Sequence, residues 1–525
     1  MHKNTPLPFS GITPKTVHFI GIGGIGMSAL AQWFIACREP GRMSQKWAVS
    51  GSDISPDETT RSLGKLGVKV RFGHKKGNLP AGRRASPALV IYTQAIRAKN
   101  AELMEARRRK IPTLAYPEAA GKLTRFYKTI AVAGAHGKST TSALVSLILI
   151  KAGFDPTVIV GTKLKEFSKR GLSRIHPHTK IWCKGKRRQA QTIKNSGGNF
   201  RAGSMRQTTS GKSPYLVLEA DEYGGAFLNY SPFLSIVTNI DREHLDFYKN
   251  LENVKKSFLA FLKKTKRGGA LVLNKDNKIL WSLKKQIQKI AAKNKLTVRW
   301  YSIRTDSPVL SRLFASIKIP GKHNISNALA ALTAGMFAGV SQKTALRAIG
   351  EYRGAWRRME YRGTCRMSHV ACRIYDDYAH HPTEIKATLQ AFREKFPRQK
   401  IVCVFQPHQA ERLRILFKDF QSAFTDADLT LILPMYQVAG RDAINRDFTS
   451  EKLAKAIQKK YPGKFVFYLG NPKNLKKAIT TLFFNTAPQP KNNLRQSASH
   501  PRTSAVLVMM GAGDIFRYTD LLLKN

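Results

Sequence analysis

The chain has 525 residues, 42% of them hydrophobic, which predicts two to four domains with ordinary cores. Lysine and arginine outnumber acidic residues by 89 to 33, giving a net charge of +56, but they are spread along the whole length without a nucleic-acid-binding signature. The first 16 residues lack the apolar segment of a signal peptide, the longest apolar run (Ala143–Ile150) is too short to span a bilayer, and five scattered cysteines are typical of reduced thiols. We therefore expect a cytoplasmic protein with a basic solvated surface, without a membrane partner or a specific nucleic-acid partner.

The first segment of the chain alternates strand and helix patterns. We predict strands at Val17–Ile20, Trp47–Ser50 and Ala88–Tyr92, and a helix at Met27–Ile35. Such alternation favours an α/β domain with a parallel sheet.

The turn between the first strand and the first helix, Gly21–Gly26, fits the pattern G-x-G-x-x-G, and Asp53 closes the next strand. This arrangement suits NAD or FAD, and equally any other diphosphate, including that of a UDP-sugar. A tight turn with a purely structural role gives the same pattern, so the motif alone leaves these alternatives open.

The α/β pattern restarts at Lys122–Lys128 with a buried strand, a glycine loop (Gly134–Ser139) and a helix. Backbone N–H groups at such a loop face anionic oxygens, and the helix dipole adds to the attraction. Lys138 supplies a point charge for the β- and γ-phosphates, and Ser139 offers a hydroxyl to Mg²⁺. Although Val132 stands where the common phosphate-loop pattern has its first glycine, the order of strand, loop and helix predicts an ATP site.

The rest of the second segment carries further polar groups behind apolar strands. Residues 165–212 are polar and basic, and we predict a surface insertion there. A predicted apolar strand at 215–222 ends in three carboxylates near the phosphate loop, which are suited to holding Mg²⁺: Glu219, Asp221 and Glu222.

A second strand, 235–240, leads to His244, which lies among carboxylates and points to a metal or phosphate site. Further along, His323, Asn324 and Asn327 begin a predicted helix. The asparagines there could cap the helix or could read a purine edge with their amides.

The third segment begins near Tyr352 and is again a doubly wound α/β pattern, with a helix at Thr383–Lys395 and a polar insertion at 486–503. We predict its strands at Arg373–Tyr375, Ile401–Phe405, Leu429–Leu433, Phe465–Leu469 and Ala505–Met509. Two loops after strands, Asp376–Pro382 and Phe405–Arg414, carry histidines beside charged groups, and Gly511–Asp514 forms another tight loop. Arg412 or Arg414 could clamp a carboxylate.

Together these motifs resemble the Mur ligases of peptidoglycan synthesis, in the family's order and over nearly all of the chain outside the two insertions. The motifs are Val17–Leu30, Gly134–Thr141, Glu219–Glu222, Thr238–Asp246, His323–Asn327, Asp376–Glu384, Phe405–His408 and Gly511–Ile515. The glycine-rich start and the His-His-Pro-Thr-Glu loop favour the branch of the family that adds L-alanine to UDP-N-acetylmuramate.

The resemblance implies the three-domain Mur ligase architecture: a Rossmann-like UDP-binding domain (1–127), a P-loop ATPase central domain (128–350) and a Rossmann-like C-terminal domain (351–525). It implies ATP and Mg²⁺ as cofactors, three small-molecule substrates (UDP-N-acetylmuramate, L-alanine and ATP), and a monomer or homodimer acting in cytoplasmic precursor synthesis. The muramate carboxylate would become an acyl phosphate, which the amine of L-alanine attacks.

The resemblance also assigns residues to roles. The UDP-sugar would meet Gly23, Gly24, Ile25, Gly26, Asp53 and His74. ATP would meet Gly134, Ala135, His136, Gly137, Lys138, Ser139, Thr140, Asn324, Asn327 and Asp377. Mg²⁺ would be held by Ser139, Glu219 and His244. The C-terminal domain would bring Tyr378, His380 and Arg412 to the substrates, and the catalytic groups would be Lys138, His380 and Arg412, with Arg412 gripping the alanine carboxylate.

Several positions depart from the family pattern. Ala135 and Ser139 stand where threonine is usual, and Ser139 keeps the hydroxyl. Gln409 replaces an arginine, Tyr223 a serine and Arg441 an acid, which weakens the assignment of the amino acid more than that of the ligase. A peptide ligase of cell-wall recycling, an NAD-dependent oxidoreductase and a nucleic-acid-stimulated P-loop NTPase are the alternatives.

Overall fold

The computed structural model describes residues 8–9, 11–37, 47–81, 86–164, 167, 198–203, 214–367, 370–437, 447–486 and 505–523. The chain divides into two compact units. The first unit comprises Met1–Glu243, Asn250–Ile317 and Ser326–Tyr352, and the second comprises His244–Lys249, Lys318–Ile325 and Arg353–Asn525. Nearly all of insertion 165–212, position 441 and residues 487–503 of the second insertion lie outside the described residues.

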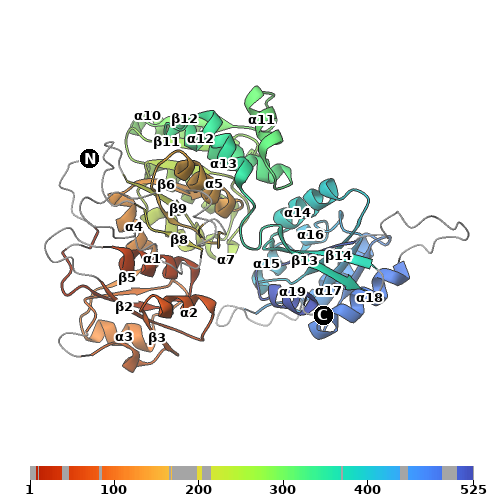
Figure 1. Cartoon of the computed structure of the whole chain (residues 1–525), viewed down its shortest axis with the longest axis horizontal. Helices are drawn as coiled ribbons and strands as arrows, with labels where there is room; N and C mark the ends of the chain where they lie inside the picture. The colour runs from red at the N-terminus through yellow and green to blue at the C-terminus, as the bar shows by residue number, and fades with distance from the viewer. Residues whose placement is uncertain are drawn as a thin grey trace, which may run out of the picture. The chain divides into compact units, whose positions relative to one another are not determined.

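The first sheet is parallel, with strand order β3-β2-β1-β4-β5, and is coloured red to orange in Figure 1. Its strands are β1 (Thr16–Ile20), β2 (Ala48–Asp53), β3 (Lys69–Phe72), β4 (Leu89–Tyr92) and β5 (Thr113–Ala115). Its helices are α1 (Ile25–Ala36), α2 (Glu58–Lys65), η1 (Lys76–Asn78), α3 (Ala101–Arg108) and α4 (Tyr116–Phe126). Because β1 lies between β2 and β4, the loops that follow these three strands meet at one edge of the sheet.

The second sheet has seven strands in the order β12-β11-β10-β6-β9-β7-β8. Its strands are β6 (Lys128–Ala133), β7 (Thr157–Ile159), β8 (Phe200–Arg201), β9 (Tyr215–Glu219), β10 (Leu234–Val237), β11 (Ala270–Asn274) and β12 (Thr297–Tyr301). All pairings are parallel except β7 with β8. Strand β8 lies inside the range 165–212 that was predicted as an insertion. It was not predicted, because the polar composition of that range shows no strand pattern.

The helices that accompany this sheet are coloured from orange-brown through yellow and green in Figure 1. They are α5 (Lys138–Lys151), η3 (Tyr223–Asn229), α8 (Leu251–Lys263), α9 (Lys278–Ser282), α10 (Lys284–Asn294), α11 (Pro308–Ser316), α12 (Lys322–Phe337) and α13 (Gln342–Glu351). The short helix α7 (Leu245–Tyr248) belongs to the second unit. One of the helices that accompany the sheet, α5, is buried on every side. In α5 every residue from Ser139 to Ile150 is buried, as expected of a helix that is apolar all round. This burial fixes the helix that carries the phosphate loop at its start.

The third sheet has the order β13-β14-β18-β15-β16-β17, with β13 antiparallel to β14 and the other pairs parallel. Its strands are β13 (Glu360–Met367), β14 (Val370–Asp377), β15 (Lys400–Phe405), β16 (Leu429–Ile432), β17 (Phe465–Tyr468) and β18 (Ala505–Met510). Its helices are α14 (Pro382–Lys395), α15 (Ala410–Ile415), α16 (Phe417–Phe420), α17 (Ser450–Lys460), η4 (Pro472–Asn474), α18 (Leu475–Thr486) and α19 (Phe516–Leu523). The last strand along the chain, β18, therefore lies between β14 and β15, and it brings three predicted loops to one edge.

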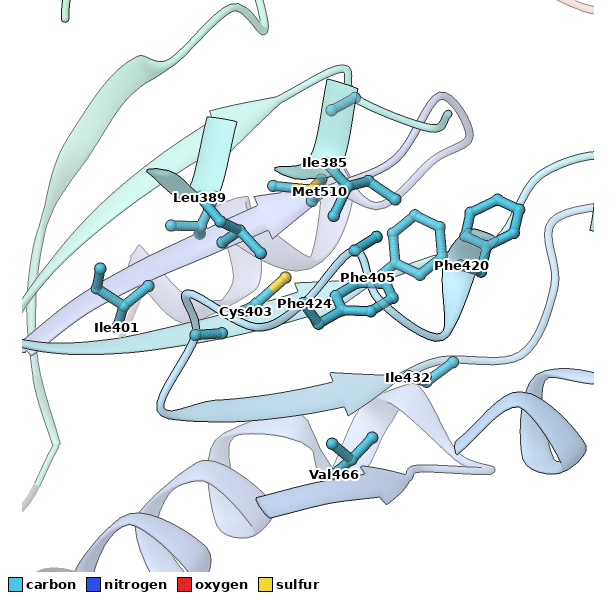
Figure 2. Close-up of a cluster of buried hydrophobic side chains, with 14 of the residues drawn as sticks. Ile385, Leu389, Ile401, Cys403, Phe405, Phe420, Phe424, Ile432, Val466 and Met510 are labelled. Atoms are coloured by element: carbon cyan, nitrogen blue, oxygen red, sulfur yellow. The ribbon is translucent and has the colours of Figure 1, made fainter. Parts of the chain in front are cut away.

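One face of the third sheet is packed by an apolar cluster, shown in Figure 2. Ile385 and Leu389 of α14 meet Cys403 and Phe405 of β15, and Phe420 of α16 joins them. Each such side chain contributes about 1.5–3 kcal/mol by leaving water. Among the described residues, no helix combines the length and apolar character that crossing a bilayer requires.

Candidate active site

The phosphate loop forms as predicted between β6 and α5, and two of its glycines are required by the space around them. Gly134 has φ 137° and Gly137 has φ 83°, both in the region that favours glycine. A Cβ on Gly134 would collide with Thr238 Oγ1, and one on Gly137 would collide with Asn327 Oδ1. The backbone of the loop thus approaches its neighbours closely, and α5 begins directly after it at Lys138. Such a helix start favours a bound phosphate.

The segment that follows β10 holds the loop in shape. His136 N donates to Asn239 Oδ1 at 2.8 Å, and Asn239 Nδ2 donates back to His136 O at 2.9 Å. Thr238 Oγ1 donates to the same carbonyl at 2.6 Å, and His136 Nε2 lies 3.0 Å from Asp241 Oδ2. Since β10 neighbours β6, these contacts arise from the strand order.

Lys138 lies inside a cluster of carboxylates. Its Nζ donates to Gly134 O at 2.6 Å and to Glu222 Oε2 at 2.9 Å. Burial alone would lower the pKa of Lys138, but the charges of Glu222, Asp221 and Glu219 outweigh it and raise the pKa. The ammonium is therefore charged and held over the loop. From the sequence, Glu222 was predicted only as one of three carboxylates that could hold Mg²⁺. In the structure its side chain is 1% exposed and forms an ion pair with Lys138.

Glu219 ends β9 in a space that only glycine leaves open. A Cβ on Gly161 would lie 2.5 Å from Glu219 Oε2. Burial raises the pKa of Tyr116, and the charges of Glu219 and Asp221 raise it further. A Cβ on Gly26 would lie 2.8 Å from the Tyr116 hydroxyl oxygen, so this phenol reaches from the first glycine loop towards the carboxylates. Tyr116 could not be recognised from the sequence, because its position depends on contacts between two sheets.

The remaining residues predicted to contact the nucleotide or the metal are divided between the units. Ser139 (7% exposed) and Thr140 (5% exposed) lie in the first turn of α5, in the first unit. Asn327 belongs to the same unit and lies beside Gly137. His244 and Asn324 belong to the second unit. Asn324 Nδ2 donates to Pro320 O at 2.7 Å, so part of its amide serves the start of α12.

The first glycine loop is closed by Asp53. Gly23 N donates to Asp53 Oδ2 at 2.7 Å, and a Cβ on Gly23 would lie 2.8 Å from the same oxygen. Gly24 is the residue before α1, so Ile25 and Gly26 form the first turn of that helix. The structure thus places Asp53, which was predicted near the diphosphate, beside the four residues predicted to meet it: Gly23, Gly24, Ile25 and Gly26.

His74 lies at the same edge, on a buried carboxylate that the sequence did not indicate. Glu102 accepts hydrogen bonds from His18 Nε2 (3.0 Å), His74 Nδ1 (3.2 Å), Ser52 Oγ (2.7 Å) and Asn78 Nδ2 (3.0 Å). Burial alone would raise the pKa of Glu102, but these bonds outweigh it and lower the pKa to about 2. Glu102 therefore orients His74 as a charged acceptor.

We expect the Glu102→Gln variant to lose stability at neutral pH. The ordinary pKa of 4.5 applies in the unfolded chain and a value of about 2 in the folded one, so the carboxylate stabilises the fold above pH 4.5 and this stabilisation disappears between pH 4.5 and 2. Its full size is roughly 3 kcal/mol. Thermal unfolding from pH 7 to pH 3 should show a gap between wild type and variant that narrows on acidification. Glu58→Gln, at an exposed glutamate, is the control, and a gap independent of pH would refute the assignment.

In the second unit, Asp377 organises the loop that follows β14. Its Oδ1 accepts from Ala379 N and its Oδ2 from Met359 N, both at 2.8 Å. Burial raises the pKa of this carboxyl group. The contacts assign Asp377 a structural task within its own unit, and its predicted contact with ATP stays a prediction.

Tyr378, His380 and Arg412 come together around His408, which lies in a predicted motif but not in the predicted site. His380 Nδ1 lies 2.9 Å from Tyr378 O and 3.3 Å from Glu384 Oε2. The rings of His380 and His408 have centroids 6.2 Å apart, and Arg412 Nη1 lies 3.5 Å from His408 Nδ1. Two imidazoles and a guanidinium therefore share one edge of the third sheet, where they can bind a carboxylate and accept a proton.

A buried arginine that sequence reasoning missed supports this edge. Arg357, 2% exposed, donates through Nη1 to Gly513 O at 2.9 Å and through Nη2 to Gly511 O. Its guanidinium also lies 5.1 Å from the ring centre of Tyr378. Burial lowers the pKa of Arg357, which nevertheless stays far above neutrality. Arg357 thus joins the Gly511–Gly513 loop to the Tyr378 loop.

Three family models match consecutive parts of the chain. They are the Mur ligase family catalytic domain at residues 16–128, the Mur ligase middle domain at 132–335 and the Mur ligase glutamate ligase domain at 357–488.

Curated relatives match over most of their length. The UDP-N-acetylmuramate–L-alanine ligase of Persephonella marina is 33% identical over 523 residues, 97% of each chain. The enzyme of the same name from Aquifex aeolicus is 34% identical over 456 residues, 84% of this chain and 88% of that protein.

Two solved structures share the fold. The UDP-N-acetylmuramate–alanine ligase of Thermotoga maritima has a TM-score of 0.66 at 24% identity, and a murein peptide ligase of Psychrobacter arcticus has a TM-score of 0.61 at 22% identity. Each comparison covers 97% of this chain and 98% of the other. The family models and the relatives matched along nearly the whole chain show that the protein belongs to the Mur ligase family.

Proposed function

We propose that the protein is an ATP-dependent ligase that joins the amine of L-alanine to the carboxylate of UDP-N-acetylmuramate, in the cytoplasmic synthesis of peptidoglycan precursors. The observation that carries this proposal is the charged Lys138 held over a glycine loop by Glu222, in a chain 33% identical over 97% of its length to a ligase of that name. A preorganised cation at a helix start is suited to a phosphoryl group in transfer.

The proposed division of labour follows the three sheets. The domain of residues 1–127 binds the UDP-sugar through Gly23–Gly26, Asp53 and His74. The domain of residues 128–350 binds ATP through the loop at Gly134–Thr140 and through Asn327, with Asn324 beside them. The domain of residues 351–525 supplies Asp377, Tyr378, His380 and Arg412.

In the proposed mechanism the muramate carboxylate attacks the γ-phosphoryl group of ATP, giving an acyl phosphate and ADP. Lys138 neutralises charge on the transferring group, and the loop N–H groups hold the phosphates in position. Arg412 binds the carboxylate of L-alanine, and His380 accepts a proton from its ammonium group, which leaves a nucleophilic amine. The amine attacks the carbonyl carbon, the C–O bond to the phosphoryl group breaks, and inorganic phosphate leaves with the remaining amine proton.

The residues present fit a Mg²⁺ ion. Oxygen donors are what this ion prefers, and the Ser139 hydroxyl and the Glu219 carboxylate supply them, while Gly161 leaves open the space that Glu219 Oε2 needs. His244 would complete the set that the family resemblance implies. When bound, Mg²⁺ would neutralise phosphate charge beside Lys138.

We expect Gly161→Ala to raise the Mg²⁺ concentration needed for half-maximal rate by about tenfold. The added Cβ would displace the Glu219 carboxylate, and loss of a group that positions a metal ligand typically lowers metal affinity by at least this factor. Activity measured against Mg²⁺ at saturating ATP tests this. Gly463→Ala is the matched control, because Gly463, like Gly161, lies outside the left-handed region, is exposed, and has no atom near the added Cβ. An unchanged Mg²⁺ requirement in Gly161→Ala would remove Glu219 from the proposed metal site.

Phosphate release with one substrate omitted at a time tests the function. The proposal predicts release from Mg-ATP only when UDP-N-acetylmuramate and L-alanine are both present. Release with the sugar and a tripeptide, but not with L-alanine, would instead indicate a ligase of cell-wall recycling. Release that is independent of the sugar and stimulated by DNA or RNA would overturn the ligase proposal.

A further inference from the structure

Two cysteines face each other across the edge of the third sheet. In the antiparallel pairing of β13 with β14, Cys365 lies directly opposite Cys372. Directly opposed residues in such pairs have Cα atoms about 4.5 or 5.5 Å apart, depending on the hydrogen-bond pattern. A disulfide needs about 4.4–6.8 Å, so either pattern brings the two backbones within bridging distance. Opposed residues also point to the same face of the sheet.

The two thiols differ in solvent exposure and in the direction of their pKa shifts. Cys372 is 4% exposed and belongs to the apolar cluster on its face of the sheet, and Cys365 packs against that cluster while remaining partly exposed. A hydrogen bond between the two thiols lowers the pKa of Cys365 and raises that of Cys372. The ammonium of Lys476 lowers the pKa of Cys365 further. The more accessible sulfur is therefore also the one more readily present as thiolate, the reactive form.

The other described cysteines lack this combination. Cys403 is fully buried in the cluster of Figure 2, where burial raises its pKa, and Cys37 is 1% exposed. All four described cysteines are reduced thiols. Cys403 is therefore a matched control on the same sheet.

We propose that Cys365 and Cys372 form a reversible dithiol–disulfide site, which a small anionic disulfide oxidises through Cys365. The neighbouring Lys476 favours an anionic reagent. The Cys365 thiolate attacks one sulfur of the reagent, forming a mixed disulfide and releasing one thiol of the reagent. Cys372 then gives up its proton and attacks Sγ of Cys365, which releases the second thiol. One external disulfide becomes two thiols, while two protein thiols become one disulfide.

The bridge would fasten the edge strand β13 to β14 near the pairing of Met367 with Val370, at the opposite end of β14 from the loop of Asp377. The same two strands are already joined by Arg362 of β13, which binds Asp376 of β14 and lies 2.7 Å from Asp520 of α19. Strand β13 contains a register shift between Tyr361 and Gly363. Cys365 lies beyond this shift, towards Met367. A disulfide there would fix the register of β13, an edge strand of the sheet, on β14.

Oxidised glutathione is the probe for the test, applied to the full chain with thiols counted after denaturation. Of the four described cysteines, we expect the wild type to keep two as thiols, Cys37 and Cys403, and Cys403→Ser to keep one. Trypsin cuts after Arg362, Arg366 and Arg373, so the oxidised protein should yield peptides 363–366 and 367–373 joined and about 2 Da lighter than their sum. Reduction should restore all thiols.

The single variants separate the two roles. Cys372→Ser should stop at a glutathione adduct on Cys365, and Cys365→Ser should keep the Cys372 thiol because that side chain is buried. If Cys372→Ser fails to fold, Cys372→Ala serves in its place. Retention of all five wild-type thiols, a bridge between other cysteines, or an adduct that forms first on Cys372 would overturn the proposal.

Discussion

Replacing Lys138 with methionine is expected to lower kcat about 10³-fold, with little change in the affinity for UDP-N-acetylmuramate. Removal of one preorganised group that stabilises developing charge has an effect of about this size. Lys138 Nζ lies 2.6 Å from Gly134 O, and the carboxylates around it hold it in the charged form. Steady-state kinetics and titration of the UDP-sugar, measured separately, test the prediction.

The variant leaves Glu222 buried without its cation, which destabilises the fold for a reason unrelated to catalysis. The double variant Lys138→Met with Glu222→Gln removes that charge and should be as inactive as the single variant while unfolding at a higher temperature. Lys255→Met, which breaks the ion pair of Lys255 with Glu252 on the surface of α8, is the control and should keep full activity. A double variant within tenfold of wild-type kcat would show that Lys138 only shapes the loop.

The second large effect is expected at Arg412. Arg412→Ala should raise KM for L-alanine about 10²-fold, because a charge-assisted, two-pronged contact with a carboxylate is worth roughly 1.5–3 kcal/mol. KM for ATP should change less than about threefold, since the proposed contact is with the amino acid alone. Initial rates at varied L-alanine and fixed saturating ATP provide the measurement.

Arg414→Ala is the matched control for Arg412. Arg414 lies two residues further along α15 and pairs with Glu411 at 2.6 Å on the surface. It should keep KM for L-alanine within about twofold of wild type, as is usual for an exposed ion pair. Arg412→Lys keeps the charge but loses the planar fork, and we expect an intermediate KM. Equal effects of Arg412→Ala and Arg414→Ala would contradict the assigned role.

The parts of the site that could be predicted are those written into contiguous sequence. The loop from Gly134 to Ser139 needs glycine at the two positions where its backbone approaches Thr238 and Asn327. These glycines lie close together in the sequence, so they form a short motif that can be recognised. The same holds for Gly23–Gly26 with Asp53. Strands β6, β9 and β10 were recognisable because both faces of a parallel sheet are covered, which makes its strands continuously apolar.

The supporting residues could not be predicted, because their partners lie far away along the chain. Glu222 is 84 residues from Lys138, Glu102 is 84 residues from His18, and Arg357 is about 155 residues from the glycine loop that it holds. Glu102 and Arg357 look like ordinary surface charges in the sequence, and Glu222 was predicted only as one of the carboxylates for Mg²⁺. Only the strand order, which places β9 beside β6 and β18 beside β14, brings these partners together.

The edge strand β17 was predicted, but other edge strands, including β8 and β13, were missed. Strand β8 is only two residues long, and β13 carries alternating polar residues of a kind that loops share. Their positions are fixed by pairing with β7 and β14 rather than by hydrophobic pattern. The opposed cysteines of β13 and β14 became visible only through that pairing.

The most direct test of the central claim follows the oxygen atoms of the muramate carboxylate. UDP-N-acetylmuramate labelled with ¹⁸O in that group is incubated with Mg-ATP, L-alanine and the protein, and the phosphate and the UDP-linked product are analysed by mass spectrometry. The proposal predicts one ¹⁸O atom in each inorganic phosphate, the other in the new amide, and a product heavier by one alanine residue. Unlabelled phosphate, or a UDP-sugar unchanged in mass while ATP is consumed, would contradict it.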